Sequence, residues 1–245
     1  MIAWSRGCVF YVGYATITVV WGTLSLLVAW ALPYRKRFLF IIGCWTRAVL
    51  WWLHVSCGIR HEVDGLENLP STPCVVLAKH ASTWETLFLQ TVFTPQATAI
   101  KRELLNIPFF GWAFRLLKPI ALDRGQPVAA MRQLIDIGTR RLDAGIWVVL
   151  LPEGTRVPGM QVGRFYRGGG ALAVAAKRPV VVVAHNAARY WPPHRMAKHA
   201  GVIRVAISTP ISVVDGDADA VTAAARNWMV DAMGRLESST RSSTS

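Results

Sequence analysis

Runs of consecutive apolar residues alternate with amphipathic stretches through the chain from residue 61 onward. The apolar runs are short and rich in β-branched residues, as is typical of strands buried on both faces of a sheet. They occupy residues 74–80, 97–104, 118–124, 146–156, 179–186 and 201–208. Amphipathic patterns and helix start and stop residues predict helices over 82–93, 108–117, 127–142 and 168–177. This alternation predicts an α/β fold, a mostly parallel sheet covered by helices.

The first 60 residues have a different pattern, and they predict a membrane-associated helical segment in front of the sheet. No residue between Arg6 and Arg35 is charged, and as a helix this stretch is long enough to cross a bilayer. Ala29-Trp30-Ala31 imitates a signal-peptidase site, but the apolar run is longer than that of a signal peptide and a basic cluster at 35–37 follows at once. We therefore expect the segment to be retained.

A second apolar run, 38–59, carries Arg47 and His54 seven residues apart, and so on one face of a helix. Two interpretations stay open, an interfacial helix with a narrow polar stripe or a buried core helix whose polar residues find partners. The predicted organisation is membrane-anchoring helices over 1–60, one α/β domain over 61–236 and a disordered, Ser- and Thr-rich tail over 237–245.

Charge strengthens the prediction of membrane association. The 245-residue chain has a formal net charge of +13, and its mean hydropathy is +0.33. The first 61 residues contain six basic residues, six of the 11 tryptophans and no Asp or Glu, which suits an anionic lipid interface. The positive charge at 35–37 should keep the following domain on the cytoplasmic side. No nucleic-acid-binding motif accompanies the basic pI, so we expect no nucleic acid partner.

Cysteine and histidine spacings predict no metal site. The four cysteines are widely spaced, which fits reduced thiols in a cytosol-facing protein. His185, His194 and His199 form a loose group, but no carboxylate or thiolate lies at metal-ligand spacing from them.

Three polar clusters follow predicted strands: Lys79-His80 with Glu85 beyond them, Lys101-Arg102, and residues 152–156. In a parallel sheet the carboxyl ends of the strands are where sites form. We therefore expect the functional site to be built from these clusters.

Glu85 has two interpretations. Ser82-Thr83-Trp84-Glu85 fits the S-x-x-E capping box, in which the glutamate binds the backbone amide of the serine. Alternatively, Glu85 reaches back from the first helical turn to one imidazole nitrogen of His80. It would then fix the tautomer and leave the other nitrogen as a general base for a substrate hydroxyl group.

The four segments "KHASTWE", "KRELLNIPFFGWAFRLLKPIALDR", "PEGTR" and "PVVVVAHN" occur in the order of the four blocks of the glycerolipid acyltransferases. Over about residues 61–210 the chain resembles this family, and most of all its bacterial 1-acyl-sn-glycerol-3-phosphate acyltransferases. Three positions differ from the family's usual residues: Glu85 stands where aspartate is usual, Lys79 where asparagine is frequent, and Val183 where a proline is usual.

The resemblance implies transfer of a fatty acyl group from acyl-coenzyme A or acyl-carrier protein to the 2-hydroxyl of lysophosphatidate. The product is phosphatidate, made at a membrane that would be the cytoplasmic face of the bacterial inner membrane. His80 and Glu85 take the catalytic positions. A thioester is already activated, so neither a cofactor nor a metal is required.

The phosphate of the acceptor needs positive charge and hydrogen-bond donors. Arg156 offers a bidentate guanidinium, and Gly154 lets backbone amides approach closely. The resemblance adds the rest of the loop and the basic pair after the second strand, so the predicted phosphate-binding residues are Lys101, Arg102, Glu153, Gly154, Thr155 and Arg156. The alternatives are an ordinary turn at 152–156 and a solvated basic turn at 101–102.

Other functions remain open at this point. The acceptor could be glycerol-3-phosphate or another lysophospholipid, because no residue that selects acceptor size can be recognised. A catalytically inactive membrane-binding protein on the same fold is a second alternative. A hydrolase that uses Ser82 is disfavoured, since no G-x-S-x-G motif surrounds this serine.

Overall fold

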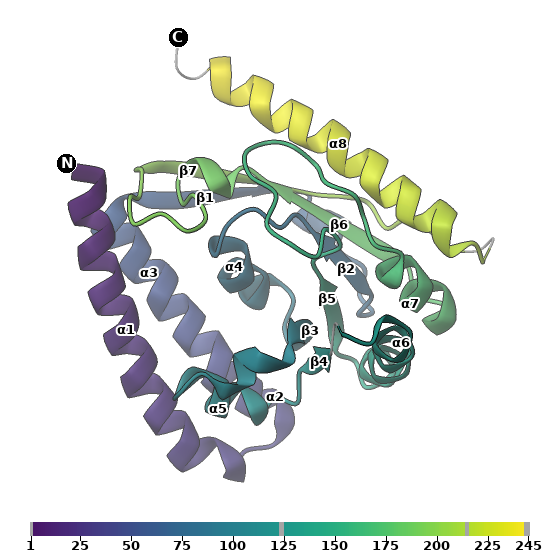
Figure 1. Cartoon of the computed structure of the whole chain (residues 1–245), viewed down its shortest axis with the longest axis horizontal. Helices are drawn as coiled ribbons and strands as arrows, with labels where there is room; N and C mark the ends of the chain where they lie inside the picture. Colours follow the sequence, from purple (N-terminus) through teal and green to yellow (C-terminus); the bar gives the residue numbers. More distant parts are fainter. Residues whose placement is uncertain (1, 123–124, 214–215, 243–245) are drawn as a thin grey trace.

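The computed structural model of the chain describes residues 2–122, 125–213 and 216–242. Within them a seven-stranded sheet lies at the centre, in the order β1-β7-β6-β2-β5-β3-β4 (Figure 1). Strands β2 to β6 all run parallel, β7 is antiparallel to β6, and the edge strand β1 is parallel to β7. The strands are β1 Ile59–Asp64, β2 Val75–Ala78, β3 Gln96–Lys101, β4 Ile120–Leu122, β5 Trp147–Leu150, β6 Val180–His185 and β7 Gly201–Ile207.

Helices cover both faces of this sheet (Figure 1). The chain contains α1 Ile2–Val28, α2 Tyr34–Phe38, α3 Trp45–Cys57, α4 Trp84–Val92, α5 Phe110–Arg115, α6 Pro127–Asp143, α7 Gly168–Ala176 and α8 Ala218–Ser242. Successive strand residues point to opposite faces. In β2, Val76 and Ala78 therefore join the core beneath α1, α3 and α4, while Val75 and Leu77 join the core beneath α6, α7 and α8. The predicted α/β class with apolar N-terminal helices is confirmed.

The strands are shorter than the apolar runs that predicted them. β5 ends at Leu150 and β2 ends at Ala78, and the polar residues that follow form loops at the carboxyl edge of the sheet. Residues 123–124 of the predicted strand 118–124 lie outside the described residues. β4 begins at Ile120, two residues after the start of the predicted strand, because Lys118 has a φ of 49° and is not extended.

Two elements have no counterpart among the predicted ones. β1 begins at Ile59 and so crosses the expected boundary at residue 60, and α8 continues through the expected boundary at 236 to Ser242. Residues 237–242 are therefore helical rather than disordered. The helix is stabilised by apolar side chains that pack on the sheet upstream of this segment, namely Val221, Ala225, Met229 and Met233. Residues 243–245 lie outside the described residues.

The N-terminal helices pack against the sheet domain. α3 buries Trp45, Val49 and Leu53 in the core, while Arg47 and His54 are exposed. The helix thus has one core face and one exposed polar stripe, and among the described residues its Arg47 and His54 do not find the buried partners that the core-helix interpretation required. By length and composition, Ile2–Ala31 and Tyr34–Cys57 could each cross a membrane, although core helices and signal sequences can have the same properties. These apolar segments fit membrane association.

A loop near the C-terminal side of β6 fastens α1 to the domain. The Lys198 amide donates a hydrogen bond to Ala3 O at 2.9 Å, and Lys198 Nζ lies 4.6 Å from the ring centroid of Tyr11. A Cβ on Gly7 would collide with Met196 O, so only glycine allows this close approach. Burial lowers the pKa of Lys198 to about 8.

Candidate active site

The carboxyl ends of β2, β5 and β6 bring their polar residues together. Lys79 and His80 follow β2, Glu153 and Arg156 follow β5, and His185 is the last residue of β6. These three strands are neighbours in the order β6-β2-β5. The site therefore lies where parallel strands end, as the sequence predicted.

His80 and Glu85 form a hydrogen-bonded pair. The distance from Nδ1 of His80 to Oε1 of Glu85 is 2.8 Å, and the side chains are 15% and 0% exposed. A carboxylate only accepts hydrogen bonds, so Nδ1 carries the proton and donates it. Nε2 is then an acceptor, and the described residues supply no hydrogen-bond partner for it. The ring can take a proton from a hydroxyl group that approaches Nε2.

The Glu85 carboxylate also binds the backbone at the start of α4. It accepts from the amides of Ala81, at 3.2 Å, and Ser82, at 2.9 Å to Oε2. The second bond is the glutamate half of a capping box, whereas the Ser82 hydroxyl accepts from the Trp84 amide at 3.2 Å and α4 begins at Trp84 without a side-chain cap from the described residues. Glu85 therefore contacts both the ring of His80 and the Ser82 amide. These amides hold the carboxylate at a fixed angle to the ring of His80.

Lys79 and Glu153 form a second pair directly behind His80. Lys79 Nζ is 2.9 Å from both carboxylate oxygens of Glu153, and both side chains are completely buried. Glu153 also accepts from the amides of His80, at 2.9 Å, and Gly163, at 2.8 Å. The structure thus places Glu153 in contacts with protein groups on every side.

Arg156 lies over the turn that leads into α4. Its Nε donates to Ser82 O at 3.1 Å and its Nη2 contacts Thr83 Oγ1 at 3.4 Å, so its guanidinium is anchored beside this turn. Gly154 has a φ of 69° and a Cβ there would meet the Tyr166 ring, which explains the need for glycine. Thr155 is exposed.

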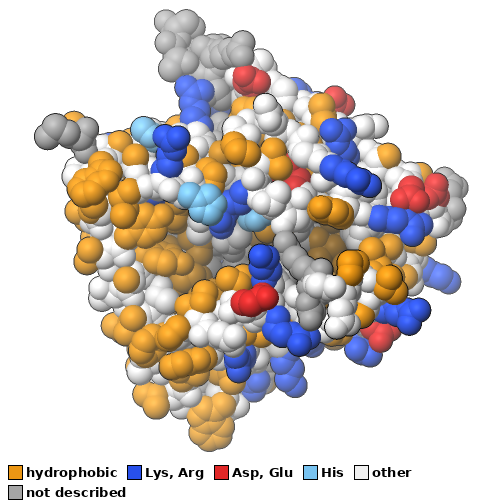
Figure 2. Space-filling view, in the orientation of Figure 1, with side chains coloured by type: hydrophobic (Ala, Val, Ile, Leu, Met, Phe, Trp, Pro, Cys, Tyr) orange, Lys and Arg blue, Asp and Glu red, His pale blue; other side chains and the backbone are white. Residues whose placement is uncertain are grey.

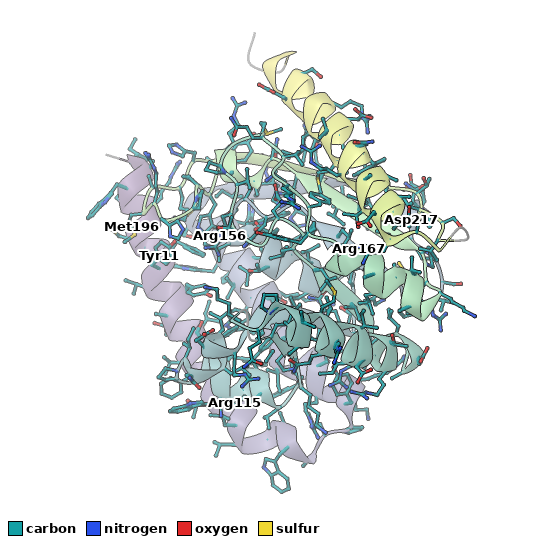
Figure 3. All side chains as sticks on the ribbon, turned by 45° about the vertical axis from the view of Figure 1, so that its right-hand side comes forward. Tyr11, Arg115, Arg156, Arg167, Met196 and Asp217 are labelled. Carbon is teal, nitrogen blue, oxygen red and sulfur yellow. The ribbon has the colours of Figure 1, made fainter. Side chains whose placement is uncertain are left out.

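Lys101 and Arg102, the other two predicted phosphate-binding residues, lie at the end of β3. Both are exposed, Lys101 as the last residue of β3 and Arg102 as the first of a short 3₁₀ helix. β5 separates β3 from β2, so the pair flanks the site from the far side of the 152–156 loop. Arg167, in contrast, pairs with Asp219 in the first turn of α8, at a distance from Arg156 (Figure 3).

His185 is a buried neighbour of the site that sequence reasoning did not assign to it. Its Nδ1 lies 3.3 Å from the Ala187 amide and its Nε2 lies 3.0 Å from Lys79 O, so Nε2 carries the proton. Burial lowers its pKa, although Glu85 acts in the opposite direction. The signal was present, because a histidine ended the most apolar strand of the chain.

The geometry suits transfer of a group to a hydroxyl. It provides a base with an oriented tautomer, an anchored guanidinium and a basic flank at 101–102. Within residues 2–122, 125–213 and 216–242 there is no cluster of three His, Cys, Asp or Glu side chains that could hold a metal ion. His80 with Glu85 could act as a base, and the guanidinium of Arg156 could bind an anion.

Comparisons with known proteins agree with this geometry. Residues 60–186 match the family model described as Acyltransferase. A Pseudomonas aeruginosa protein named 1-acyl-sn-glycerol-3-phosphate acyltransferase is 47% identical over 94% of this chain and 91% of its own length. A Saccharomyces cerevisiae protein of the same name is 31% identical over 75% of this chain and 63% of its own.

A solved structure shares the fold. The crystal structure of the 1-acyl-sn-glycerophosphate acyltransferase from Thermotoga maritima superposes with a TM-score of 0.79, covers 96% of each chain and is 21% identical. The family resemblance inferred from the four sequence blocks is confirmed by the family model and the bacterial relative. This chain belongs to the acyltransferase family.

Proposed function

We propose that this protein transfers a fatty acyl group from a thioester to the 2-hydroxyl of lysophosphatidate and so makes phosphatidate for phospholipid biosynthesis. The observation that carries the proposal is the 2.8 Å bond between His80 Nδ1 and Glu85 Oε1, which leaves Nε2 of His80 as the base. The name of the P. aeruginosa relative supplies the reaction.

In the proposed reaction, His80 Nε2 removes the proton of the acceptor's 2-hydroxyl group while the hydroxyl oxygen attacks the carbonyl carbon of the thioester. The tetrahedral intermediate then collapses, the carbon–sulfur bond breaks, and the protonated His80 returns its proton to the leaving thiolate. Glu85 stabilises the imidazolium that exists between these steps, because it is a buried carboxylate hydrogen-bonded to Nδ1. His80 and Glu85 are thus the proposed catalytic pair.

The acceptor phosphate would bind beside Arg156. Two of the guanidinium nitrogens are engaged with Ser82 and Thr83, which orients the group toward the catalytic turn. Gly154 and Thr155 lie in the same loop, and Lys101 and Arg102 add positive charge from the end of β3. A lysophosphatidate molecule whose phosphate is held here would have its 2-hydroxyl group close to His80.

The proposed partners are acyl-coenzyme A or acyl-carrier protein as donor, and membrane lipids around the N-terminal helices. The proposed location is the cytoplasmic face of a bacterial inner membrane, because the basic cluster at 35–37 follows the first apolar helix. No cofactor is needed for the proposed chemistry, since the thioester is already activated.

The test uses purified full-length protein in anionic vesicles with lysophosphatidate, and each thioester donor in turn. We expect phosphatidate formation, and a loss of kcat of about 10²–10⁴ in His80→Ala, as for a positioned general base. Glu85→Gln should also lose most of its turnover, because a neutral amide cannot stabilise the His80 imidazolium that exists between the two steps.

Three outcomes would contradict the proposal or part of it. Wild-type protein that acylates glycerol-3-phosphate but not lysophosphatidate would move the acceptor assignment to the first alternative. Protein that binds vesicles yet transfers no acyl group to either acceptor would favour an inactive membrane-binding protein. Normal turnover in Glu85→Gln would leave Glu85 as a helix cap only.

A further inference from the structure

We infer that Lys79 and Glu153 form a positioning pair that holds His80 and the 153–157 loop in register, and that Glu153 does not bind the substrate phosphate. This inference rests on the proposed function, because it takes His80 to be the base. Neither residue would touch the reacting atoms.

The hydrogen-bonding capacity of Glu153 is fully used by the protein. Its two oxygens accept four bonds: two from Lys79 Nζ, one from the His80 amide and one from the Gly163 amide. A carboxylate has about four acceptor sites and no donor, and an ionised phosphate is likewise an acceptor. The two groups cannot hydrogen-bond to each other, and their like charges repel.

Lys79 is equally occupied. Its ammonium has three donors, and they reach the two oxygens of Glu153 and, at 3.3 Å, the carbonyl of Val157. A buried ion pair is tolerated when both members are satisfied in this way. The pair therefore ties the end of β2 to both ends of the 153–157 loop.

The same contacts fix the backbone on both sides of His80. Its amide donates to Glu153, and its carbonyl accepts from the Val157 amide at 2.9 Å. The preceding carbonyl, that of Lys79, accepts from His185 Nε2. The peptide that carries the imidazole is thus held by residues from the ends of β5 and β6.

This arrangement relates two distant parts of the proposed chemistry. Arg156 lies between Glu153 and Val157, so the pair that holds the loop also sets the separation of its guanidinium from the ring of His80. A misplacement of about 1 Å in a catalytic group can cost about 10²-fold in rate. Glu153 and Lys79 would act on turnover through this distance.

The test removes both charges together, in Lys79→Met/Glu153→Gln, because one buried charge left alone would destabilise the fold. We expect kcat to fall about 10²-fold. The KM for lysophosphatidate should change little, since Arg156 remains. The control is Arg178→Met/Asp143→Asn, which removes an ion pair at the opposite edge of the sheet. It should keep wild-type kcat and KM.

Lys79→Arg provides a second variant, because a guanidinium keeps the charge pair and hence the fold. Its different reach should displace the loop and give a kcat between those of the double variant and the wild type. Wild-type kcat in Lys79→Arg would overturn the inference, and would do so even if the double variant failed to fold.

A double variant that folds and has wild-type kcat would also overturn the inference. So would a raised KM for lysophosphatidate with unchanged kcat, because that is the result expected when a phosphate ligand is removed. Wild-type and control proteins are measured in the same acyl-transfer assay. If these two form no phosphatidate, it is the proposed function that fails, whatever the variants do.

Discussion

At the scale of single residues, Glu85 both orients the imidazole of His80 and binds the backbone at the start of α4. It contacts the imidazole of His80 and two backbone amides, and it lies at the first turn of α4. The spacing of five residues could be recognised in the sequence, but sequence alone could not separate a cap from a catalytic partner, because one carboxylate serves both. The contacts of Glu153 could not be foreseen, since they join strands that only the folded sheet makes neighbours.

Arg156 is expected to affect binding of the acceptor lysophosphatidate much more than binding of the acyl donor. A guanidinium spans Ser82, Thr83 and an anion through a planar fork, whereas an ammonium supplies charge alone. We expect Arg156→Lys to raise the KM for lysophosphatidate about tenfold or more, by loss of about 1.4 kcal/mol or more of binding. The KM of the donor should change much less. Steady-state kinetics with each substrate varied in turn check this.

A phosphate-free acceptor, monoacylglycerol, sharpens the comparison. Wild-type protein should strongly prefer lysophosphatidate, and Arg156→Ala should lose most of that preference. Arg140→Lys, on the exposed face of α6, is the matched control and should behave as wild type. An unchanged preference in Arg156→Ala would remove this residue from the phosphate site.

His185 predicts a dependence of stability on pH. Burial lowers its folded-state pKa below the ordinary value of 6.5, against the raising effects of Glu85 and Glu153 and together with the lowering effect of Lys79. The unfolded chain therefore binds a proton that the folded chain excludes, and stability falls as the pH drops below about 6.5. Thermal unfolding of wild type and His185→Gln between pH 7 and pH 5 should show the smaller decline in the variant. Equal declines would contradict this.

At the scale of elements, continuous apolar runs located six of the strands, and helix start and stop residues located α4, α5, α6 and α7. β1 escaped this reasoning because four of the six residues in its sequence, IRHEVD, are polar, and this edge strand is exposed except at Ile59 and, in part, Val63. Its place in the sheet depends on pairing with β7, a partner far along the chain. β1 forms because of this long-range pairing, which the local sequence pattern cannot reveal.

The contact between α7 and α8 offers a test at this scale. A Cβ on Gly170 would collide with the backbone carbonyl of Ala218 and with Thr222 Oγ1, so the two helices are close because this residue is glycine. Gly170→Ala should lower the free energy of unfolding by about 1–3 kcal/mol through overpacking. Thermal or denaturant unfolding measures this.

Gly234 serves as the control, because a Cβ there meets nothing within 4 Å. In a helix interior, Gly234→Ala should raise the free energy of unfolding by about 0.5–1 kcal/mol. If both variants were stabilised, the close approach of α7 to α8 would not depend on Gly170.

At the scale of the whole molecule, hydrophobic side chains gather over the N-terminal helices while basic residues lie mainly elsewhere on the same face (Figure 2). Among the exposed apolar side chains of α1 are Trp4, Val12 and Leu27, each more than 60% exposed. A soluble surface rarely has so large an apolar patch. The distribution fits an enzyme whose N-terminal face contacts the bilayer.

This face predicts the effect of polar substitutions. Val12→Asn/Leu27→Asn should weaken binding to anionic vesicles about tenfold or more, since each side chain contributes roughly 1 kcal/mol or more of apolar burial. Thermal unfolding in detergent should change little, because both side chains lie outside the core. Vesicle flotation measures the binding.

Val230→Asn is the control for this variant. Val230 is an exposed apolar residue of α8, which covers the opposite face of the sheet from α1 (Figure 1). Val230→Asn should leave the flotation of the protein with vesicles unchanged. Equal flotation of wild type and Val12→Asn/Leu27→Asn would exclude these positions from the contact with lipid.

The pairing of β1 with β7 also orders events during synthesis. Ile59 pairs with Gly201, so the backbone of β1 has no neighbouring strand until the ribosome has made most of the chain. At about 5–20 residues per second, that interval is on the order of ten seconds. The apolar helices α1 and α3 leave the ribosome before this interval begins. We therefore expect the apolar helices to meet the bilayer first, so that the sheet is completed on a chain already attached there.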